Sequence, residues 1–312
     1  MSKIVRIGLI IFASILIACL IGLMVTGYQI GWGPFAQFQR FKCVTYPITD
    51  TEYKYVREKR TIEGPNGMIV GNLFTPETEA DAGRLVILSH GLSTTQWQNM
   101  NTANSLAHAG VRVFIFDYCG GAIHSQSEGK TTDMSVITEK ADLNAVIDAV
   151  KAWKGVDPNK IGIIGYSQGG FVAALTAAER DDIDRLCLIY PALSMFAEIR
   201  GDYPDGSMIP EQQKRNGMLV GKRYYQDIID LQTDNIYEYV ASYTGPVMIQ
   251  HGTADAAVPY ESSVAAAAAY PNCEFITLEG ASHGFTGEDD VYSVQKEYEF
   301  FTRQGEAGGT DR

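Results

Sequence analysis

The sequence predicts an α/β protein with a mostly parallel eight-stranded sheet, helices on both faces and a helical cap insertion, preceded by an N-terminal transmembrane helix. Short apolar runs alternate with longer helix-forming segments over most of the chain. Two strand-like segments at the start have no helix between them, which indicates an antiparallel beginning to a sheet that then becomes parallel. A stretch of more than fifty residues interrupts the alternation and predicts the cap.

The expected elements follow from these patterns. One helix, with apolar residues at helical spacing from Val136 to Trp153, should end before Gly155 and Asp157-Pro158, which are strong stop signals. The expected strands are 53–62, 68–75, 85–89, 111–116, 161–166, 185–190, 246–250 and 274–278, and the expected helices lie near 97–109, 138–154, 169–179, 260–269 and 289–303.

The domain boundaries come from changes in composition. We expect a signal-anchor or transmembrane segment at 1–28, a linker at 29–50, the α/β domain at 51–304 and a polar, disordered tail at 305–312. The cap insertion covers about 191–243 and is rich in Tyr and Met, which suit an adaptable apolar wall for the acyl or alcohol part of a substrate.

The N-terminal segment has the features of a membrane anchor. Lys3 and Arg6 precede an uncharged apolar stretch from Ile7 to Val25, and nineteen helical residues nearly span a bilayer. The basic residues place the N-terminus in the cytoplasm and the domain outside, as a single-pass protein of the cell membrane. A cleaved signal peptide and secretion, or a lipoprotein with Cys19 as its lipidated residue, remain alternatives.

The most informative motif lies at 161–169. An apolar strand, Ile161–Ile164, runs into Gly165-Tyr166-Ser167-Gln168-Gly169, and an Ala-rich helix follows at once. Strand, sharp turn and helix are the context in which a G-x-S-x-G sequence becomes a nucleophile elbow. We therefore expect Ser167 to have a strained backbone and to stand at the N-terminus of the helix, where negative charge is stabilised.

Two further residues complete a catalytic triad with Ser167. Asp255 follows the strand 246–250, and His283 lies in the loop after the strand 274–278. In this scheme His283 takes the proton of Ser167 and later gives it to the leaving group, while Asp255 fixes the imidazole tautomer. Open α/β sheets place such residues past the C-terminal ends of their strands.

Other residues of the same types are weaker candidates. Asp230 and Asp234 also follow Ser167, but neither comes after an apolar strand. Among the other histidines, His251 reads as a structural residue in a strand-end turn, and His124 lies in a polar loop as an open candidate for substrate binding. Asp117 reads as a structural acid at the end of a strand.

Acyl transfer also needs two donors for an oxyanion. The amide after the nucleophile, Gln168, supplies one, and the loop His90-Gly91-Leu92 after the strand 85–89 supplies the second. Within that loop the Leu92 amide is the preferred donor, with Ser93 as the alternative.

Charge and composition narrow the range of partners. The net charge of −12 argues against nucleic acids and anionic membrane surfaces as partners. The chain has no P-loop, no dinucleotide fingerprint and no clustered His/Cys at metal-ligand spacing, so we expect no cofactor and no metal. The oligomeric state does not follow from the sequence.

These motifs resemble those of a known group of enzymes. The run Phe116-Asp117-Tyr118-Cys119-Gly120-Gly121, the segment 125–135, the Gly-Tyr-Ser-Gln-Gly-Gly elbow and the Ala-Ser-His-Gly-Phe loop are similar to bacterial α/β-hydrolases of the cinnamoyl/feruloyl-esterase-like group. That group in turn resembles monoacylglycerol-lipase-like and serine-aminopeptidase-like hydrolases. The resemblance covers about residues 53–303. Gly120-Gly121-Ala122-Ile123-His124 departs from a Gly-His-Gly turn found in some relatives, which leaves the contacts of this loop with a phenolic ester open.

The resemblance implies an α/β-hydrolase fold and ester hydrolysis by Ser167, His283 and Asp255, with oxyanion donors at Leu92 and Gln168. We expect a small-molecule ester as substrate and a covalent acyl-enzyme. A peptidase or an acyltransferase would use the same triad. A catalytically silent surface-binding module is the alternative of a different class, and it has no need of a strained serine aligned with a histidine.

Overall fold

The computed structural model describes residues 44–78 and 82–303. The helices and strands of these described residues belong to one unit, which begins at Thr45. The expected anchor at 1–28, most of the expected linker and the expected tail at 305–312 lie outside the described residues. Among residues 44–78 and 82–303, no helix combines the length and the apolar character needed to cross a bilayer.

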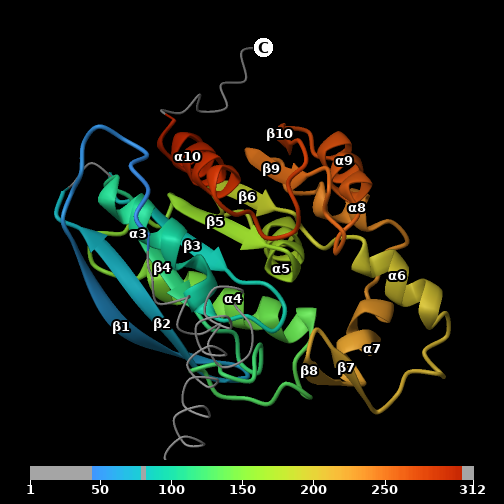
Figure 1. The fold of residues 1–312 in the computed structure, drawn as a ribbon. Coiled ribbons are helices and arrows are strands. Elements are labelled where there is room, and N and C mark those ends of the chain that lie inside the picture. Colours follow the sequence, from blue (N-terminus) through green and yellow to red (C-terminus); the bar gives the residue numbers. More distant parts are fainter. Residues whose placement is uncertain (1–43, 79–81, 304–312) are drawn as a thin grey trace, which may run out of the picture. The chain divides into compact units, whose positions relative to one another are not determined.

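An eight-stranded sheet forms the centre of the domain (Figure 1). Its strands lie in the order β1-β2-β4-β3-β5-β6-β9-β10, and only β2 runs against its neighbours. The antiparallel start and the mostly parallel sheet expected from the sequence are therefore confirmed. The strands are β1 (Tyr55–Gly64), β2 (Gly67–Pro76), β3 (Leu85–Ser89), β4 (Arg112–Phe116), β5 (Ile161–Tyr166), β6 (Arg185–Ile189), β9 (Val247–Gly252) and β10 (Cys273–Leu278).

Helices cover both faces of this sheet, and the strands are apolar on both sides as a result (Figure 1). Along β3, Leu85 and Ile87 belong to the core under α4 (Val136–Lys151) and α5 (Gln168–Ala178). Val86 and Leu88 belong to the core under α3 (Met100–His108) and α10 (Glu288–Thr302). All four side chains are fully buried. The helices are the 3-10 turn η2 (Gln96–Asn99), α3 (Met100–His108), α4 (Val136–Lys151), α5 (Gln168–Ala178), α9 (Tyr260–Ala269) and α10 (Glu288–Thr302).

Local sequence signals set the ends of α4. The Ser135 hydroxyl accepts from the amides of Ile137 and Thr138, and the Thr138 hydroxyl accepts from the Ser135 amide, which is a capping box. The helix ends at Lys151, ahead of Gly155 with its φ of +79°.

The cap is the segment between β6 and β9. It contains the helices α6 (Met195–Asp202), α7 (Arg223–Ile229) and α8 (Ile236–Val240) and a hairpin of β7 (Gln212–Arg215) and β8 (Met218–Gly221). The expectation of a helical cap missed this hairpin. Its signal is the Asn216-Gly217 pair, since both residues have positive φ (+48° and +77°), as the tight turn of a two-residue hairpin requires.

The chain before β1 lies along the domain. The Tyr46 amide donates to the Ser105 hydroxyl at 2.8 Å, the Tyr46 hydroxyl donates to Asp290, and Ile48 is buried against the core beside α3. Residues 46–48 of the expected linker therefore pack against α3 and α10.

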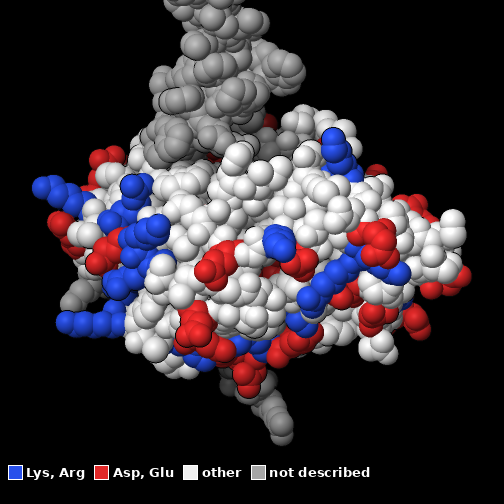
Figure 2. All heavy atoms as spheres, turned by 90° about the horizontal axis from the view of Figure 1, so that it is seen from below, with Lys and Arg blue, Asp and Glu red and all other residues white. Residues whose placement is uncertain are grey.

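Charged side chains of both signs are mixed over the face shown in Figure 2. The acidic excess of the sequence is thus not gathered into one uniform patch on that face.

Close packing of β5 against α5 gives a stability prediction. A Cβ at Gly165 would lie 2.6 Å from the Gly169 carbonyl oxygen and 2.8 Å from the Ala173 Cβ, so we expect Gly165→Ala to reduce the free energy of unfolding by about 1–3 kcal/mol. The matched control is Gly201→Ala in α6, where a Cβ meets nothing within 4 Å and replacing glycine removes an entropic cost. Urea denaturation of the two variants measures the difference. Equal stabilities would contradict the packing argument.

Candidate active site

Ser167 occupies the sharp turn between β5 and α5. Its backbone has φ +53° and ψ −119°, which confirms the strain expected from the sequence. The turn is possible because its glycines lie against backbone: a Cβ at Gly169 would come within 2.4 Å of the carbonyl oxygens of Ser89 and His90. Ser167 therefore stands at the N-terminus of α5, past the C-terminal end of a central strand.

The structure brings the three residues of the predicted triad together. His283 Nε2 lies 3.1 Å from Ser167 Oγ, and His283 Nδ1 lies 2.7 Å from Asp255 Oδ2. The Asp255 side chain is completely buried, whereas 28% of the His283 side chain is exposed. A serine in reach of an imidazole that is oriented by a carboxylate has the geometry of an activated nucleophile.

The Asp255 carboxylate lies within hydrogen-bond distance of two histidines, His251 and His283. Its Oδ2 lies 3.0 Å from His251 Nε2, and its Oδ1 accepts from the amides of Ala257 and Val258 at 2.8 and 2.9 Å. Burial alone would raise the pKa of Asp255, but the hydrogen bonds from His251, His283 and the two amides hold it well below its usual range. Asp255 is therefore a carboxylate at neutral pH, fixed in place on both oxygens.

His251 is a structural residue, as the sequence suggested. It is fully buried, and its Nδ1 lies 2.6 Å from the Ser263 hydroxyl. This hydrogen bond links β9 to α9. The sequence did not indicate that His251 would share one carboxylate oxygen with His283.

Aromatic rings enclose His283 on one side. The Tyr190 ring lies 4.5 Å from the imidazole, and Phe285 packs edge-on against Tyr190 at 5.0 Å. Tyr190 follows β6 and has a φ of +38°, while its amide donates to the Gln250 carbonyl at 2.7 Å. Residues that follow β6 and β10, two strands on the same side of β5, thus pack around the imidazole.

The loop after β3 passes beside Ser167. A Cβ at Gly91 would lie 3.3 Å from the Ser167 Cβ, so only glycine allows this approach without displacement. Leu92 is half-buried and Ser93 has a φ of +59°. From the tip of the cap hairpin, the Asn216 side-chain amide donates to the Ser93 hydroxyl at 2.8 Å and to the Leu92 carbonyl at 3.3 Å.

The side chain of His90 links this loop to the chain after β4 by hydrogen bonds. Its Nδ1 donates to the Gly91 carbonyl at 2.9 Å, and its Nε2 accepts from the Tyr118 amide at 3.1 Å. Burial lowers the pKa of His90, so the ring is neutral and has a structural role.

The side chain of Gln168 points away from the solvent into a buried network. Its Nε2 donates to Glu139 at 2.8 Å, and its Oε1 accepts from the hydroxyl of Tyr224 in the cap at 2.7 Å. Burial raises the pKa of Glu139 to about 8, although the hydrogen bond from Gln168 opposes that rise. This network, which sequence reasoning missed, joins α4, the elbow and the cap.

The remaining candidates lie elsewhere. His124 is exposed in the loop after β4, and Asp117 is a buried structural acid that accepts from the amides of Gln96 and Gln126. Asp230 lies at the end of α7 in the cap, and Asp234 is exposed. Among residues 44–78 and 82–303, no group of three or more His, Cys, Asp or Glu side chains could hold a metal ion.

The raised pKa of Glu139 predicts a specific pH dependence of stability. A carboxyl that is protonated in the folded state but ionised in the unfolded chain makes stability fall as the pH rises from about 4.5 to about 8. We expect Glu139→Gln to remove this part of the decline, so that its free energy of unfolding falls less than that of the wild type between pH 5 and pH 8.5.

Urea denaturation at the two pH values tests this expectation. Glu179→Gln is the matched control, because the pKa of Glu179 is lowered and its charge does not change over that interval. A decline in Glu139→Gln as steep as in the wild type would show that Glu139 is already ionised in the folded protein.

Two solved structures share the fold of this chain. Est1E from Butyrivibrio proteoclasticus, in a structure with bound ferulic acid, has 27% sequence identity, covers 76% of this chain and 97% of its own, and superposes with a TM-score of 0.67. An esterase from Pyrococcus furiosus, at 20% identity, covers 80% of this chain and 93% of its own with a TM-score of 0.58, which shows the shared fold.

Sequence relatives have similar coverage. An uncharacterised protein of Mycobacterium tuberculosis is 26% identical over 224 residues, which is 71% of this chain and 70% of that protein. The uncharacterised protein YfhR of Salmonella typhimurium is 28% identical over 209 residues, 66% of this chain and 67% of its own.

The α/β-hydrolase fold implied by the sequence motifs is confirmed by these structures. A match to the prolyl oligopeptidase family (Peptidase_S9) covers residues 97–307, a range that includes Ser167, Asp255 and His283. The chain is therefore a hydrolase of the α/β-hydrolase fold and belongs to the prolyl oligopeptidase family.

Proposed function

We propose that this protein hydrolyses carboxylic esters, with Ser167 as nucleophile, His283 as general base and acid, and Asp255 as the carboxylate that orients His283. The observation that carries the proposal is the pair of distances at His283, 3.1 Å to Ser167 Oγ and 2.7 Å to Asp255 Oδ2. The similarity to Est1E, a protein that binds ferulic acid in its solved structure, supports an ester rather than a peptide as substrate.

The reaction has two steps. Ser167 Oγ gives its proton to His283 Nε2 and attacks the ester carbonyl. The bond from the carbonyl carbon to the alcohol oxygen then breaks, and that oxygen takes the proton from His283, which leaves the acyl group on Ser167. Water next gives a proton to His283 and adds to the acyl carbonyl. The bond from the carbonyl carbon to Ser167 Oγ then breaks, Oγ takes the proton back from His283, and the acid is released.

The oxyanion of each tetrahedral intermediate would bind to the amides of Leu92 and Gln168. Gln168 is the first residue of α5, so its amide is one of those left without a partner inside the helix. The approach of Gly91 to Ser167 supports this assignment, because the loop that carries Leu92 passes close to the nucleophile. The Asn216 contacts on Leu92 and Ser93 would hold this loop in place.

The family match favours a second candidate, a peptidase that uses the same residues. The two functions differ in the leaving group: an amine is a poorer leaving group than an alcohol and depends more on protonation by His283. A direct comparison of an ester with an anilide of the same acyl group therefore separates them.

The proposal predicts a large loss of esterase activity when the hydroxyl oxygen of Ser167 is removed. With p-nitrophenyl esters of graded acyl length, we expect Ser167→Ala to reduce kcat by about 10⁴-fold or more, because the nucleophile and its base act as a unit. Ser194→Ala is the matched control, since the Ser194 side chain makes no capping hydrogen bond at α6. An aminoacyl p-nitroanilide is assayed in parallel.

Two results would overturn the proposal. Turnover of the anilide with none of the esters would assign the site to a peptidase. Ester turnover that survives in Ser167→Ala would place the chemistry at another residue.

A further inference from the structure

The loop that carries Leu92 contains a strained turn. The Thr94 amide donates to the Gly91 carbonyl at 3.3 Å, so Gly91 to Thr94 form a four-residue turn. Its third residue, Ser93, has a φ of +59°, a conformation that turns of this type normally give to glycine or asparagine. Because this conformation is unfavourable for serine, contacts from outside the turn have to hold it in place.

The cap hairpin of β7 and β8 makes such contacts. At its tip, the Asn216 side-chain amide donates to the Ser93 hydroxyl at 2.8 Å and to the Leu92 carbonyl at 3.3 Å. These acceptors belong to the two central residues of the turn, so one amide group bridges them. Asn216 also suits the hairpin, because a two-residue loop with positive φ at both positions favours the sequence Asn-Gly.

The base of the hairpin packs against the chain that precedes α4. The Thr131 hydroxyl donates to the Leu219 carbonyl at 2.6 Å, and a Cβ at Gly221 would lie 2.1 Å from the Thr132 carbonyl oxygen. The backbone of β8 therefore lies directly against residues 131–132. This packing, and not only its own hydrogen bonds, sets where Asn216 lies relative to the loop after β3.

The same hairpin is also linked to the elbow. Arg215 directly precedes Asn216, and its guanidinium carbon lies 5.7 Å from the centre of the Tyr224 ring. Tyr224 is fully buried, and its hydroxyl donates to Gln168 Oε1 at 2.7 Å. Two adjacent residues of the hairpin are thus connected to both residues whose amides are the proposed oxyanion donors, Leu92 and Gln168.

We propose that the β7–β8 hairpin holds the oxyanion hole in its active geometry, with Asn216 as the positioning residue for the Leu92 donor. The proposal rests on ester hydrolysis at Ser167 and adds the cap to the parts of the protein that stabilise the transition state. Oxyanion donors are effective when they are fixed in place before the charge develops. Asn216 should therefore affect the transition state more than the binding of the ground-state ester.

The test variant is Asn216→Gly, which removes the amide donor and keeps the tip of the hairpin, because glycine adopts a positive φ freely. With p-nitrophenyl butyrate we expect kcat to fall about three- to tenfold, the range that corresponds to the loss of one ordinary hydrogen bond. KM should stay within about twofold. Acylation and deacylation both pass through an oxyanion, so kcat should fall whichever step is slower.

An inhibitor that forms an oxyanion gives a readout that a merely structural role would not move. In a trifluoromethyl ketone, Ser167 Oγ adds to the ketone carbon, its proton goes to His283, and the carbonyl oxygen becomes the oxyanion. The Ki of such a ketone should rise in Asn216→Gly by the same factor by which kcat/KM falls. Titration of active enzyme with a fluorophosphonate corrects for any misfolded fraction.

A second substitution tests the strain argument. Glycine adopts a φ of +59° without strain, so Ser93→Gly should make the turn less dependent on the hairpin. We therefore expect Asn216→Gly to reduce kcat less in the Ser93→Gly background than in the wild type. This double-mutant cycle measures the coupling between the two residues directly.

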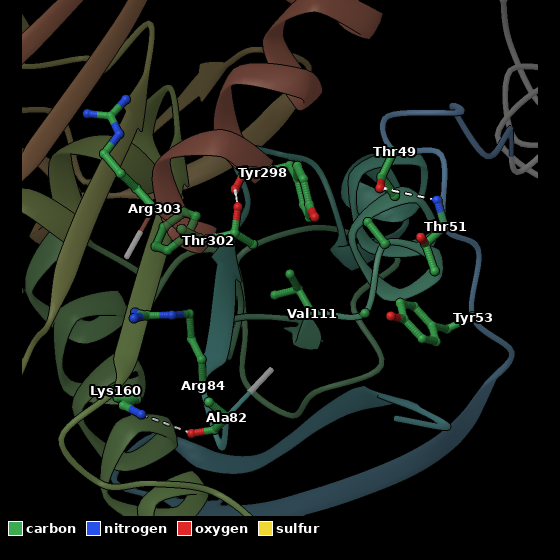
Figure 3. Close-up of a pocket in the computed structure, with 13 residues that line it drawn as sticks. Thr49, Thr51, Tyr53, Ala82, Arg84, Val111, Lys160, Tyr298, Thr302 and Arg303 are labelled. Carbon is green, nitrogen blue, oxygen red and sulfur yellow. Dashed lines mark hydrogen bonds between the residues drawn. The ribbon is translucent and has the colours of Figure 1, made fainter. Parts of the chain in front are cut away.

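Two controls keep the wild-type kcat. Lys214→Ala lies in β7 of the same hairpin, where Lys214 is exposed and its side chain makes no hydrogen bond or ion pair with the described residues. Thr51→Ala lies in the wall of a cavity of about 450 Å³ (Figure 3). Lys160, in the same wall, precedes β5, whereas Ser167 follows that strand, so this cavity is at the opposite end of the sheet.

Several results would overturn the proposal. One is an unchanged kcat in Asn216→Gly, and another is a reduced kcat with an unchanged Ki for the ketone. An equal loss of kcat in the wild-type and Ser93→Gly backgrounds would also contradict it.

If Asn216→Gly does not fold, Asn216→Asp replaces it, because aspartate also suits the tip but cannot donate to the Leu92 carbonyl. The same fall in kcat is expected, and wild-type kcat and Ki in that variant would overturn the proposal. A wild-type protein that turns over no ester would contradict ester hydrolysis itself, and this proposal with it.

Discussion

The turn at Ser167 is the constraint on which the rest of the site depends. A non-glycine residue with φ +53° and ψ −119° persists only where its surroundings leave no alternative. Here β5 and α5 pack closely at Gly165 and Gly169. Gly169 also lies against the carbonyl oxygens of Ser89 and His90 at the end of β3. At the end of β6, the Ile189 carbonyl oxygen accepts from the Ser167 amide. Strain at one residue is thus offset by packing across three strands, and the serine is pre-organised before any substrate binds.

Buried carboxyl groups on either side of that turn are in opposite states. Asp255 is held ionised by four hydrogen-bond donors, whereas burial favours the protonated form of Glu139. In the proposed mechanism, the charge of Asp255 stabilises the His283 imidazole when it takes the proton of Ser167. Glu139 accepts from the side chain of Gln168, whose Oε1 accepts from Tyr224, so this carboxyl is linked to the elbow and to the cap. The cap is therefore tied to the base of the nucleophile as well as to the loop at Leu92.

Local sequence patterns were enough to place the strands of the central sheet and most helices, and they singled out Ser167, Asp255 and His283, whose side chains meet in the structure. Each triad residue directly follows an apolar strand or comes within a few residues of its end, and parallel strands bring their ends to one edge of a sheet. The hairpin in the cap was missed because β7 and β8 have only four residues each. In addition, β7 (Gln212–Arg215) has no apolar residue and therefore no alternation of apolar and polar side chains. The Glu139–Gln168–Tyr224 contacts join residues 29 and 56 positions apart, and no local pattern distinguishes Glu139 from an ordinary acid in the first turn of a helix.

The central claim is that Ser167 forms a covalent acyl-enzyme, and its most direct test is mass spectrometry of the protein quenched during turnover of p-nitrophenyl acetate. The proposed chemistry predicts a rapid release of p-nitrophenol equivalent to the enzyme, together with one acetyl group on the peptide that contains Ser167. An acetyl group on a different residue, or steady turnover with neither a burst nor an adduct, would contradict it.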